Sequence, residues 1–359
     1  MRHNINPNQI SLFDSIENRG VIERERESRI RPCHIYNDII SVENLLAAWR
    51  EFLRGKRHRQ DVALFSLHLT DNILLLQREL ANRTYRHGPY RAFKINDPKP
   101  RHIHKASVRD RLVHHVIYRV LYPYFDSKFI FDSFSCRRGK GTHRAMNRFQ
   151  QYCRQISRNN TRTAWILKGD IRKFFASIDH KILRDILSRQ IRDNDVVRLL
   201  GEVIGSFQTK DKPNIGLPLG NLTSQLLVNI YLNEFDYFIK RKLKIAYYVR
   251  YADDFVIISD DKRWLANQIR PISDFLFNNL QLQLHSDKVF IKSLASGVDF
   301  LGWVHFPRHR VLRTATKRRM LKRIIENPKP ESVNLYLGLI SHGNSYKLRE
   351  RIANLCDFC

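Results

Sequence analysis

The sequence has few acidic residues for its number of basic ones. It contains 35 aspartates and glutamates against 63 lysines and arginines, so its formal net charge is +28 and its isoelectric point is near 10.2. The basic residues are spread along the whole chain. A folded protein with this charge repels itself unless a polyanion neutralises it, so we expect nucleic acid as a partner. A ribosome-associated or merely basic protein is the alternative that charge alone leaves open.

The sequence also lacks long apolar runs and has few cysteines. The N-terminal stretch MRHNINPNQISLFDS has no apolar core of a signal peptide, and no run approaches membrane-spanning length. The five cysteines are odd in number, and none has metal-ligand spacing with a histidine. We therefore expect a soluble protein in a reducing, cytoplasmic setting, with no membrane partner, no disulfide framework and no zinc site.

Helical and strand patterns alternate along the chain. Of its residues 43% are hydrophobic, which is enough to form the cores of two or three compact lobes. Residues 1–40 are polar and are expected to lie outside the core. Apolar spacing predicts helices over 41–49, 65–80, 108–125 and 180–191, a long helix after IGLPLGN, and a basic helical tail from RTATKRRMLKRII. Strands are predicted over 163–170, 247–259 and 298–306. This mixture predicts the α+β fold class.

Two adjacent aspartates, Asp253 and Asp254, interrupt the apolar stretch YYVRYADDFVIIS. Aspartate is a common turn residue, but the flanking apolar residues indicate a turn that projects from a buried hairpin. Two carboxylates there repel each other unless a cation lies between them. Asp170 ends the strand TAWILKGD, and strand ends in one sheet can bring it opposite the hairpin tip. Three carboxylates suit hard divalent cations, and two such ions about 3.5–4 Å apart serve phosphoryl transfer. The pattern therefore suggests nucleotidyl transfer on a polynucleotide.

With YADD between two strands, the chain resembles a reverse transcriptase over about residues 41–350. The block KGDIRKFFASIDH resembles the one that carries the family's first metal-binding aspartate. That resemblance implies Asp170 and the carbonyl of Ile171 as ligands beside the hairpin pair, with two Mg²⁺ ions, or alternatively Mn²⁺, as cofactor. Phe175 matches the aromatic residue that excludes a ribose 2′-OH. Ordinary core packing is the alternative for Phe174 and Phe175.

Basic residues in two further blocks match the fingers of that family. PKPRHIHKASVRDRLVHHVI resembles the segment that grips the incoming triphosphate, which implies Lys99 and Arg101 as dNTP ligands. FSCRRGKGTHRA resembles the next fingers block, which implies that Arg137, Arg138 and Lys140 contact the template backbone. A solvated basic loop is the alternative for this second group.

The C-terminal half carries other blocks of the family. Lys288 in LQLHSDKVFI stands where the family has a lysine proposed to protonate the pyrophosphate leaving group, and a solvated surface lysine is the alternative. VDFLGWVHF resembles the primer-grip turn, with Gly302 at its centre. The basic tail is expected to contact the backbone of the duplex through Lys317, Arg318, Arg319, Lys322 and Arg323. The alternative is that these residues form only a solvated helix face.

The block IGLPLGNLTSQLLVNIYLNE departs from most of the family, which has Gln-Gly at its start and Ser-Pro at its end. Here the corresponding pairs are Leu219-Gly220 and Ser224-Gln225. This departure resembles the reverse transcriptases of diversity-generating retroelements, which copy a template-repeat RNA with errors at adenines for mutagenic retrohoming. The resemblance implies a small basic, oligomeric accessory variability-determinant protein as a partner. It also implies that Gly220 and Gln225 contact the dNTP and that Leu219 and Ser224 contact template and primer.

Leucine at position 219 suggests a hypothesis about fidelity. A glutamine there would present an amide near the nascent base pair, whereas leucine offers no hydrogen bond, so mispairs lose less relative to correct pairs. The alternative is that Leu219 only packs against the fingers.

The resemblance implies a prokaryotic or phage-encoded right-hand polymerase that takes template RNA, primer or cDNA, and dNTPs. The expected parts are an extension over 1–40, fingers over 41–162, a palm over 163–306 with 190–215 returning to the fingers, and a short helical thumb over 307–359. An anti-phage defence enzyme and a group II intron or retron enzyme are the alternatives. The lack of a maturase-like or HNH-like extension after residue 359 is taken to weigh against the intron type. A non-catalytic RNA-binding protein on a polymerase scaffold is the alternative from another class.

Overall fold

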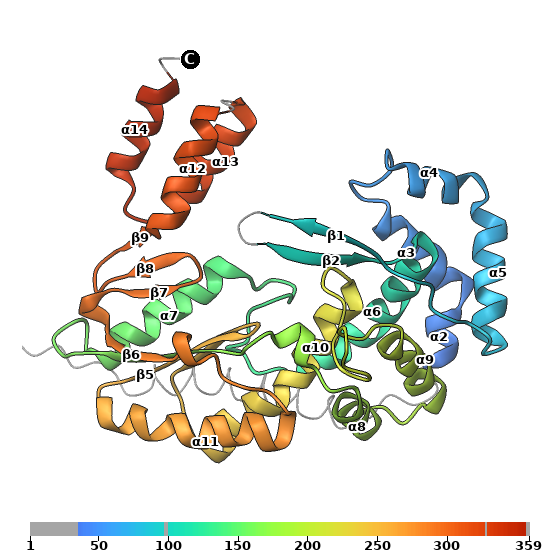
Figure 1. The fold of residues 1–359 in the computed structure, drawn as a ribbon, viewed down its shortest axis with the longest axis horizontal. Coiled ribbons are helices and arrows are strands. Elements are labelled where there is room, and N and C mark those ends of the chain that lie inside the picture. The colour runs from blue at the N-terminus through green and yellow to red at the C-terminus, as the bar shows by residue number, and fades with distance from the viewer. Residues whose placement is uncertain (1–34, 97–99, 327–328, 357–359) are drawn as a thin grey trace, which may run out of the picture. The chain divides into compact units, whose positions relative to one another are not determined.

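The computed structural model describes residues 35–96, 100–326 and 329–356, which form two compact units (Figure 1). The first unit runs to Phe129 and resumes over Phe175–Asn233. The second comprises Ile130–Phe174 and the chain from Glu234 onward. Each unit is therefore built from two separate stretches of sequence.

The first unit is mainly helical. Its helices are α2 (Tyr36–Ile40), α3 (Val42–Phe52), α4 (Gln60–Leu67), α5 (Leu69–Ala81), α6 (Val108–Lys128), α8 (His180–Gln190), α9 (Asn194–Gly205) and most of α10 (Leu222–Tyr237). The hydroxyl of Ser41 accepts a hydrogen bond from the backbone N–H of Asn44 at 3.1 Å and so caps α3. Tyr36 and Ile39 of α2 are buried, so the end of the expected N-terminal extension belongs to the core of this unit. Residues 1–34 lie outside the described part.

One predicted helix is divided in the structure. Residues 65–80 were expected to form a single helix, but α4 ends at Leu67 and α5 begins at Leu69. His68 between them has φ −118° and ψ 40°, which is not helical backbone. The side-chain amide of Asn72 donates to the carbonyl of Phe65 at 3.1 Å and satisfies one of the acceptors that the end of α4 leaves free.

The described residues of the basic stretch 93–106 belong mostly to a β-hairpin, which the sequence did not predict. Its antiparallel strands are β1 (Arg91–Ile95) and β2 (Arg101–Lys105), with Phe93 opposite Ile103. β1 is exposed along its whole length, so there is no buried face to produce the alternation by which strands are recognised.

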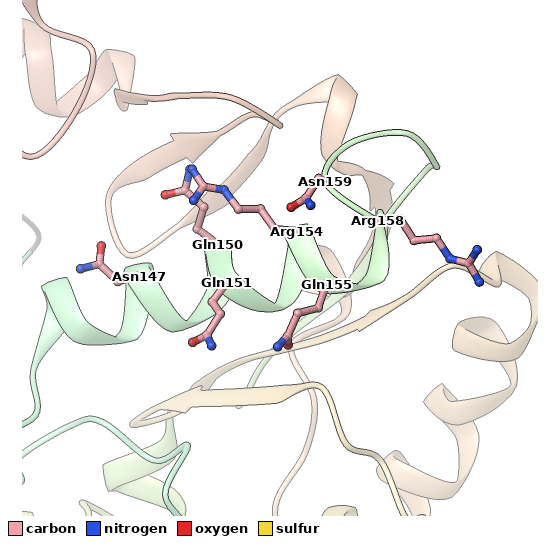
Figure 2. A pocket seen from close by; sticks show the side chains of 7 residues that line it. All are labelled: Asn147, Gln150, Gln151, Arg154, Gln155, Arg158 and Asn159. Carbon is pink, nitrogen blue, oxygen red and sulfur yellow. The ribbon is translucent and has the colours of Figure 1, made fainter. Parts of the chain in front are cut away.

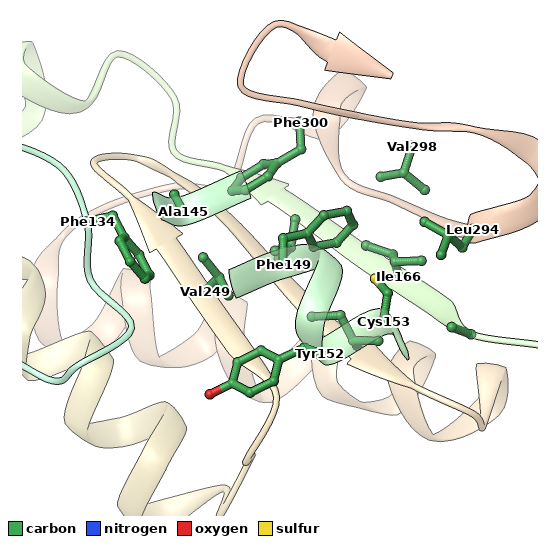
Figure 3. Close-up of a cluster of buried hydrophobic side chains, with 13 residues drawn as sticks. Phe134, Ala145, Phe149, Tyr152, Cys153, Ile166, Val249, Leu294, Val298 and Phe300 are labelled. Atoms are coloured by element: carbon green, nitrogen blue, oxygen red, sulfur yellow. The ribbon is translucent and has the colours of Figure 1, made fainter. Parts of the chain in front are cut away.

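The second unit is built on a four-stranded antiparallel sheet in the order β4-β5-β3-β6. The strands are β3 (Trp165–Asp170), β4 (Tyr248–Tyr251), β5 (Asp254–Ser259) and β6 (Phe290–Ser293). Helix α7 (Thr142–Ile156) packs on the sheet through a cluster that includes Phe149, Ile166 and Val256 (Figure 3). Helix α11 (Lys262–Leu280) also packs on the sheet, against β3, β5 and β6. The mixture of helices and antiparallel strands confirms the predicted α+β class.

A smaller sheet follows, formed by β7 (Val298–Phe300), β8 (Trp303–His305) and β9 (Arg310–Leu312). The turn between β7 and β8 consists of Leu301 and Gly302, with φ of 52° and 86°. Two positive φ values are what a two-residue hairpin turn of type I′ requires, so the predicted strand pair around Gly302 is confirmed. The basic tail forms α12 (Thr314–Glu326), α13 (Pro330–Ile340) and α14 (Tyr346–Cys356), which share a core with Trp303.

Two expectations about composition are tested only in part. Among the described residues, no helix is both long enough and apolar enough to span a bilayer. Cys136 and Cys153 are free thiols. Cys356 and Cys359 do have CxxC spacing, but their side chains, like Cys33, lie outside the described part, so the expectation of no disulfide or zinc site is not tested there.

Gly169, the residue before Asp170, yields a test of how β3 and β5 pack in the main sheet. A Cβ atom built on Gly169 would lie 2.2 Å from the ring of Phe255, its cross-strand partner, so Gly169→Ala is expected to lower the free energy of unfolding by about 1–3 kcal/mol through overpacking. Urea denaturation measures the change. Gly338→Ala is the matched control, because nothing lies within 4 Å of a Cβ there and α13 gains up to about 1 kcal/mol of helix propensity. Equal effects of the two substitutions would contradict the close contact.

Candidate active site

The three predicted carboxylates converge at one end of the main sheet. β3 and β5 pair so that Asp170 lies opposite Asp254. Asp253 is in the turn between β4 and β5, and its carbonyl accepts from the backbone N–H of Ile171 at 3.3 Å. The prediction that Asp170 lies opposite the hairpin tip is confirmed. We call Asp170, Asp253 and Asp254 the carboxylate cluster.

Two lysines contact the carboxylate cluster. The Nζ atom of Lys288 lies 2.7 Å from Oδ1 of Asp170 and donates to it. Lys288 is in a short 3₁₀ helix, Ser286–Lys288, that follows His285, whose backbone N–H donates to the carbonyl of Asp170 at 2.8 Å. The structure thus brings Lys288 to the cluster, with its side chain 43% exposed, and its role as a proton donor stays a prediction.

Lys168 is a member of the site that the sequence interpretation missed. It is buried in β3, and its Nζ atom lies 3.2 Å from Oδ1 of Asp254. Side chains two residues apart in a strand share a face, so Lys168 is on the same face of β3 as Asp170. A lysine inside the otherwise apolar run WILKGD is the sequence signal that could have identified it.

The charge of the cluster is only partly neutralised. Burial and the charges of Asp170 and Asp254 raise the pKa of Asp253 to about 6, and Lys288 offsets them only in part. Burial also raises the pKa of Asp254, which Lys168 opposes. The Lys168 contact lacks hydrogen-bond geometry, and Oδ1 of Asp254 has no hydrogen-bond partner among the described residues. Buried carboxylates with unsatisfied charge need a further cation.

This oxygen-rich donor set fits a hard divalent cation, which prefers carboxylate and carbonyl ligands. Among the described residues, no three or more His, Cys, Asp or Glu side chains are arranged as a ready-made metal site, and Asp254 and Asp170 are paired with Lys168 and Lys288. A cation bound by the cluster would compete with these two ammonium groups. The carbonyl of Ile171 as a further ligand stays a prediction.

A cavity of about 550 Å³ adjoins Asp170 through Lys288. Its lining is mostly basic and consists of Arg172, Lys173, Leu284, His285, Ser286, Asp287 and Lys288. The sequence interpretation missed Arg172 and Lys173, although they follow Asp170 directly in KGDIRKFF. Compact and forked cations beside a carboxylate cluster suit a phosphate-bearing ligand.

A second hollow, of about 490 Å³, lies on α7 and the loop after it (Figure 2). It is lined by amides and arginines only, namely Asn147, Gln150, Gln151, Arg154, Gln155, Arg158 and Asn159. None of these side chains is a carboxylate or an imidazole. The catalytic chemistry is therefore assigned to the carboxylate cluster and not to this hollow.

The predicted nucleotide ligands lie in the first unit. Arg101 begins β2 and is exposed, whereas Lys99 lies outside the described residues. Phe174 is 2% exposed and belongs to the core, while Phe175 is half-buried. Ordinary packing thus accounts for Phe174, and the role of Phe175 stays a prediction.

The block around Leu219 is attached to the β1–β2 hairpin. The carbonyl of Leu219 accepts from the backbone N–H of His104 at 3.1 Å, and the amide of Asn221 donates to the carbonyl of His104 at 2.9 Å. Gly220 between them has φ 105°, and a Cβ atom there would lie 2.9 Å from Ile103. The backbone of the block is fixed, and the Leu219 side chain is half-buried. In α10, Ser224 is buried and Gln225 half-buried.

The template contacts predicted in the block FSCRRGKGTHRA lie in the second unit. The guanidinium of Arg137 donates to the carbonyls of Ile130 and Ser133, at 2.7 and 3.0 Å. The ammonium of Lys140 donates to the carbonyl of Phe131 at 2.9 Å. Both side chains thus hold their own loop, and any contact with template would be additional.

The remaining predicted positions include Arg138, which is exposed, and the Gly302 turn. On α12, Lys317 and Arg319 are half-buried, and the other cations are exposed, namely Arg318, Lys322 and Arg323. Their nucleic-acid contacts stay predictions.

Comparison with known families identifies the class. Residues 94–305 match the family described as "Reverse transcriptase (RNA-dependent DNA polymerase)", and this match covers more than half of the sequence. The chain therefore belongs to the reverse transcriptase family. The predicted class of RNA-directed DNA polymerase and its polymerase fold are confirmed.

Two relatives and one solved structure illustrate the range of similar proteins. The chain is 25% identical over 317 residues to Protein YkfC of Escherichia coli (strain K12), covering 77% of this chain and 80% of that protein. It is 24% identical over 321 residues to the group II intron-encoded protein LtrA of Lactococcus lactis subsp. cremoris, covering 69% of this chain and 51% of that protein. The chain thus spans about half the length of LtrA. Apo telomerase from Candida tropicalis, truncated from its C-terminal domain, matches with a TM-score of 0.47 and 11% identity over 68% of this chain and 60% of that one.

The raised pKa of Asp253 predicts how its removal changes stability. In the folded, metal-free protein this pKa is about 6. It is about 3.9 in unfolded chains, so the folded state binds the proton more tightly and ionisation of Asp253 destabilises it. The penalty is absent below the unfolded pKa and complete above pH 6. With a chelator present, Asp253→Asn is therefore expected to raise the free energy of unfolding by about 1–3 kcal/mol at pH 8 and by little near pH 4.

Urea denaturation at a series of pH values measures this difference. Asp260→Asn, an exposed aspartate six residues after Asp254, is the control and should show no such dependence on pH. A stability gain in Asp253→Asn that is the same at every pH would contradict the ionisation of Asp253 as its cause.

Proposed function

We propose that this reverse transcriptase copies a template-repeat RNA into cDNA in a diversity-generating retroelement, with errors at template adenines. The convergence of the carboxylate cluster supports nucleotidyl transfer, and the block Leu219-Gly220-Asn221-Leu222-Thr223-Ser224-Gln225 supports the subtype. A small basic, oligomeric accessory variability-determinant protein is the proposed partner. A group II intron type of enzyme is the second candidate, supported by the similarity to LtrA.

Asp170, Asp253 and Asp254 would hold Mg²⁺, or alternatively Mn²⁺, and such ions supply Lewis-acid activation of the attacking and leaving oxygens. The fit rests on the oxygen donors and on the uncompensated charge of the cluster. Lys168 and Lys288 would give up part of their contact with Asp254 and Asp170 if a cation bound there.

The chain's own side chains then bind and orient the substrate. Arg172 and Lys173 line the cavity beside Asp170 and bind the phosphates of the dNTP. Lys288 lines the same cavity and contacts Asp170, which supports the proposal that it donates a proton to the departing pyrophosphate. By the family resemblance, Arg101 and Lys99 grip the triphosphate, and Phe175 excludes ribonucleotides.

Other positions are assigned from the same resemblance. Gly220 and Gln225 contact the dNTP, while Leu219, Ser224 and Gly302 contact template and primer. The template backbone is bound by Arg137, Arg138 and Lys140, and the duplex by the cations of α12. The proposed parts are fingers over 41–162, with 190–215 returning to them, a palm over 163–306 and a thumb over 307–359.

Extension of a DNA primer on an RNA template tests the catalytic assignment. Wild type is expected to extend the primer only when Mg²⁺ or Mn²⁺ is added, and Asp253→Asn to lose activity by roughly 10³-fold or more, because charge stabilisation at the reacting phosphate is lost. Asp260→Asn is the control and should retain activity. A wild type that stays inactive with its own RNA and accessory protein present would contradict polymerase function and favour an RNA-binding role.

Substitution of Leu219 tests the subtype. Leu219→Gln adds an amide on a backbone already fixed by His104, so the frequency of misincorporation opposite adenine is expected to fall by a few-fold to about tenfold, the range of one net hydrogen bond. Leu219→Met keeps an apolar side chain of similar size and should leave the error spectrum as it is. Sequencing of cDNA copied from a defined RNA measures both. Identical spectra for the two variants would mean that Leu219 only packs against the fingers.

A further inference from the structure

A buried ion pair lies next to the turn that carries Asp253. Arg250, in the middle of β4, is 1% exposed, and Asp236, in the last turn of α10, is 0% exposed. The Nε and Nη2 atoms of Arg250 donate to the two carboxylate oxygens of Asp236 at 2.7 and 2.6 Å. A buried guanidinium is tolerated only when its charge and its N–H groups are matched, and this bidentate pair matches both.

The same guanidinium reaches the catalytic turn. Its Nη1 atom donates to the carbonyl of Ala252 at 3.2 Å. Ala252 is the first residue of the turn and has φ 54°, a left-handed conformation that the Cβ atom of alanine makes sterically unfavourable. The Ala252 carbonyl belongs to the peptide plane that joins Ala252 to Asp253. A donor on this oxygen therefore fixes the plane from which the Asp253 side chain extends.

The arginine itself is held from its other side. Its Nη2 atom also donates to the hydroxyl of Ser133 at 3.0 Å. The backbone N–H of Arg250 donates to the carbonyl of Asp132 at 2.9 Å, and the N–H of Phe134 donates to the carbonyl of Arg250 at 3.0 Å. The segment 132–134 thus runs along the outer edge of β4. The guanidinium is anchored independently of the turn that it contacts.

We propose that Arg250 is a positioning residue for Asp253: paired with Asp236, it holds the left-handed Ala252 and so aims the Asp253 carboxylate at the other two aspartates. Only the planar guanidinium of an arginine can bind both oxygens of Asp236, the Ser133 hydroxyl and the Ala252 carbonyl at once. A lysine in its place carries one nitrogen and cannot span these partners. The proposal rests on polymerase function at the carboxylate cluster.

Arg250→Lys tests the proposal, with Tyr248→Phe as the matched control. The Tyr248 hydroxyl donates to Asp236 Oδ1 at 2.8 Å and also interacts with Arg250, but among the described residues no hydrogen bond joins it to Ala252 or Asp253. Both variants lose a buried hydrogen bond and are expected to unfold at a lower urea concentration. Arg250→Lys is expected to lower kcat roughly 10- to 100-fold with little change in KM for the dNTP, because a misplaced Asp253 impairs the chemical step. Tyr248→Phe should keep the wild-type kcat.

A second measurement does not depend on catalysis. The affinity for Mn²⁺, followed by electron paramagnetic resonance, is expected to fall in Arg250→Lys and to stay unchanged in Tyr248→Phe. Circular dichroism shows whether Arg250→Lys folds. If it does not fold, Asp236→Glu is used instead, because the longer side chain keeps the negative charge but displaces the Arg250 guanidinium. Equal kcat and Mn²⁺ affinity in the two variants would overturn the positioning role. An inactive wild type would instead refute polymerase function.

Discussion

Repulsion among three carboxylates at the end of one sheet is the constraint on which the second unit depends. Asp170 and Asp254 are cross-strand neighbours, and Asp253 is in the adjoining turn, so their charges cannot separate without breaking the sheet. Lys168 and Lys288 pair with two of them, and the raised pKa of Asp253 reflects first its burial and then the neighbouring carboxylate charges. In the proposed function, a divalent cation bound by the cluster would offset the energetic cost of the arrangement. A site that is unfavourable without its ligand and favourable with it suits two-metal phosphoryl transfer.

The surrounding packing keeps this cluster from relaxing. The ring of Phe255 fills the space above Gly169, which ties β5 to β3 one residue before the aspartates. Helix α7 packs on the strands through Phe149, and α11 adds further contacts. The Arg250–Asp236 pair stabilises the strained turn from behind. Apolar packing therefore fixes the strands, while buried polar contacts fix the peptide that carries Asp253.

Much of this arrangement could be predicted from the sequence because it depends on local patterns. The strand ending at Asp170, the hairpin around Asp253 and the strand pair around Gly302 follow from apolar alternation and turn chemistry, and each is present. What the sequence did not predict depends on tertiary contacts. Nothing near Arg250 in the chain identifies Asp236 as its partner, and the β1–β2 hairpin has no buried face to reveal it. The break at His68 likewise has no glycine or proline to mark it.

We infer that the carboxylate cluster is a cation site whose negative charge destabilises the folded protein unless a cation binds. The most direct measurement is the change in melting temperature on adding Mg²⁺ to chelator-treated protein, compared between wild type and Asp170→Asn. A ligand that binds only the folded state stabilises it, so we expect Mg²⁺ to raise the melting temperature of the wild type and to have little effect on that of Asp170→Asn. An equal rise in both proteins would contradict this inference, since Mg²⁺ would then be acting elsewhere.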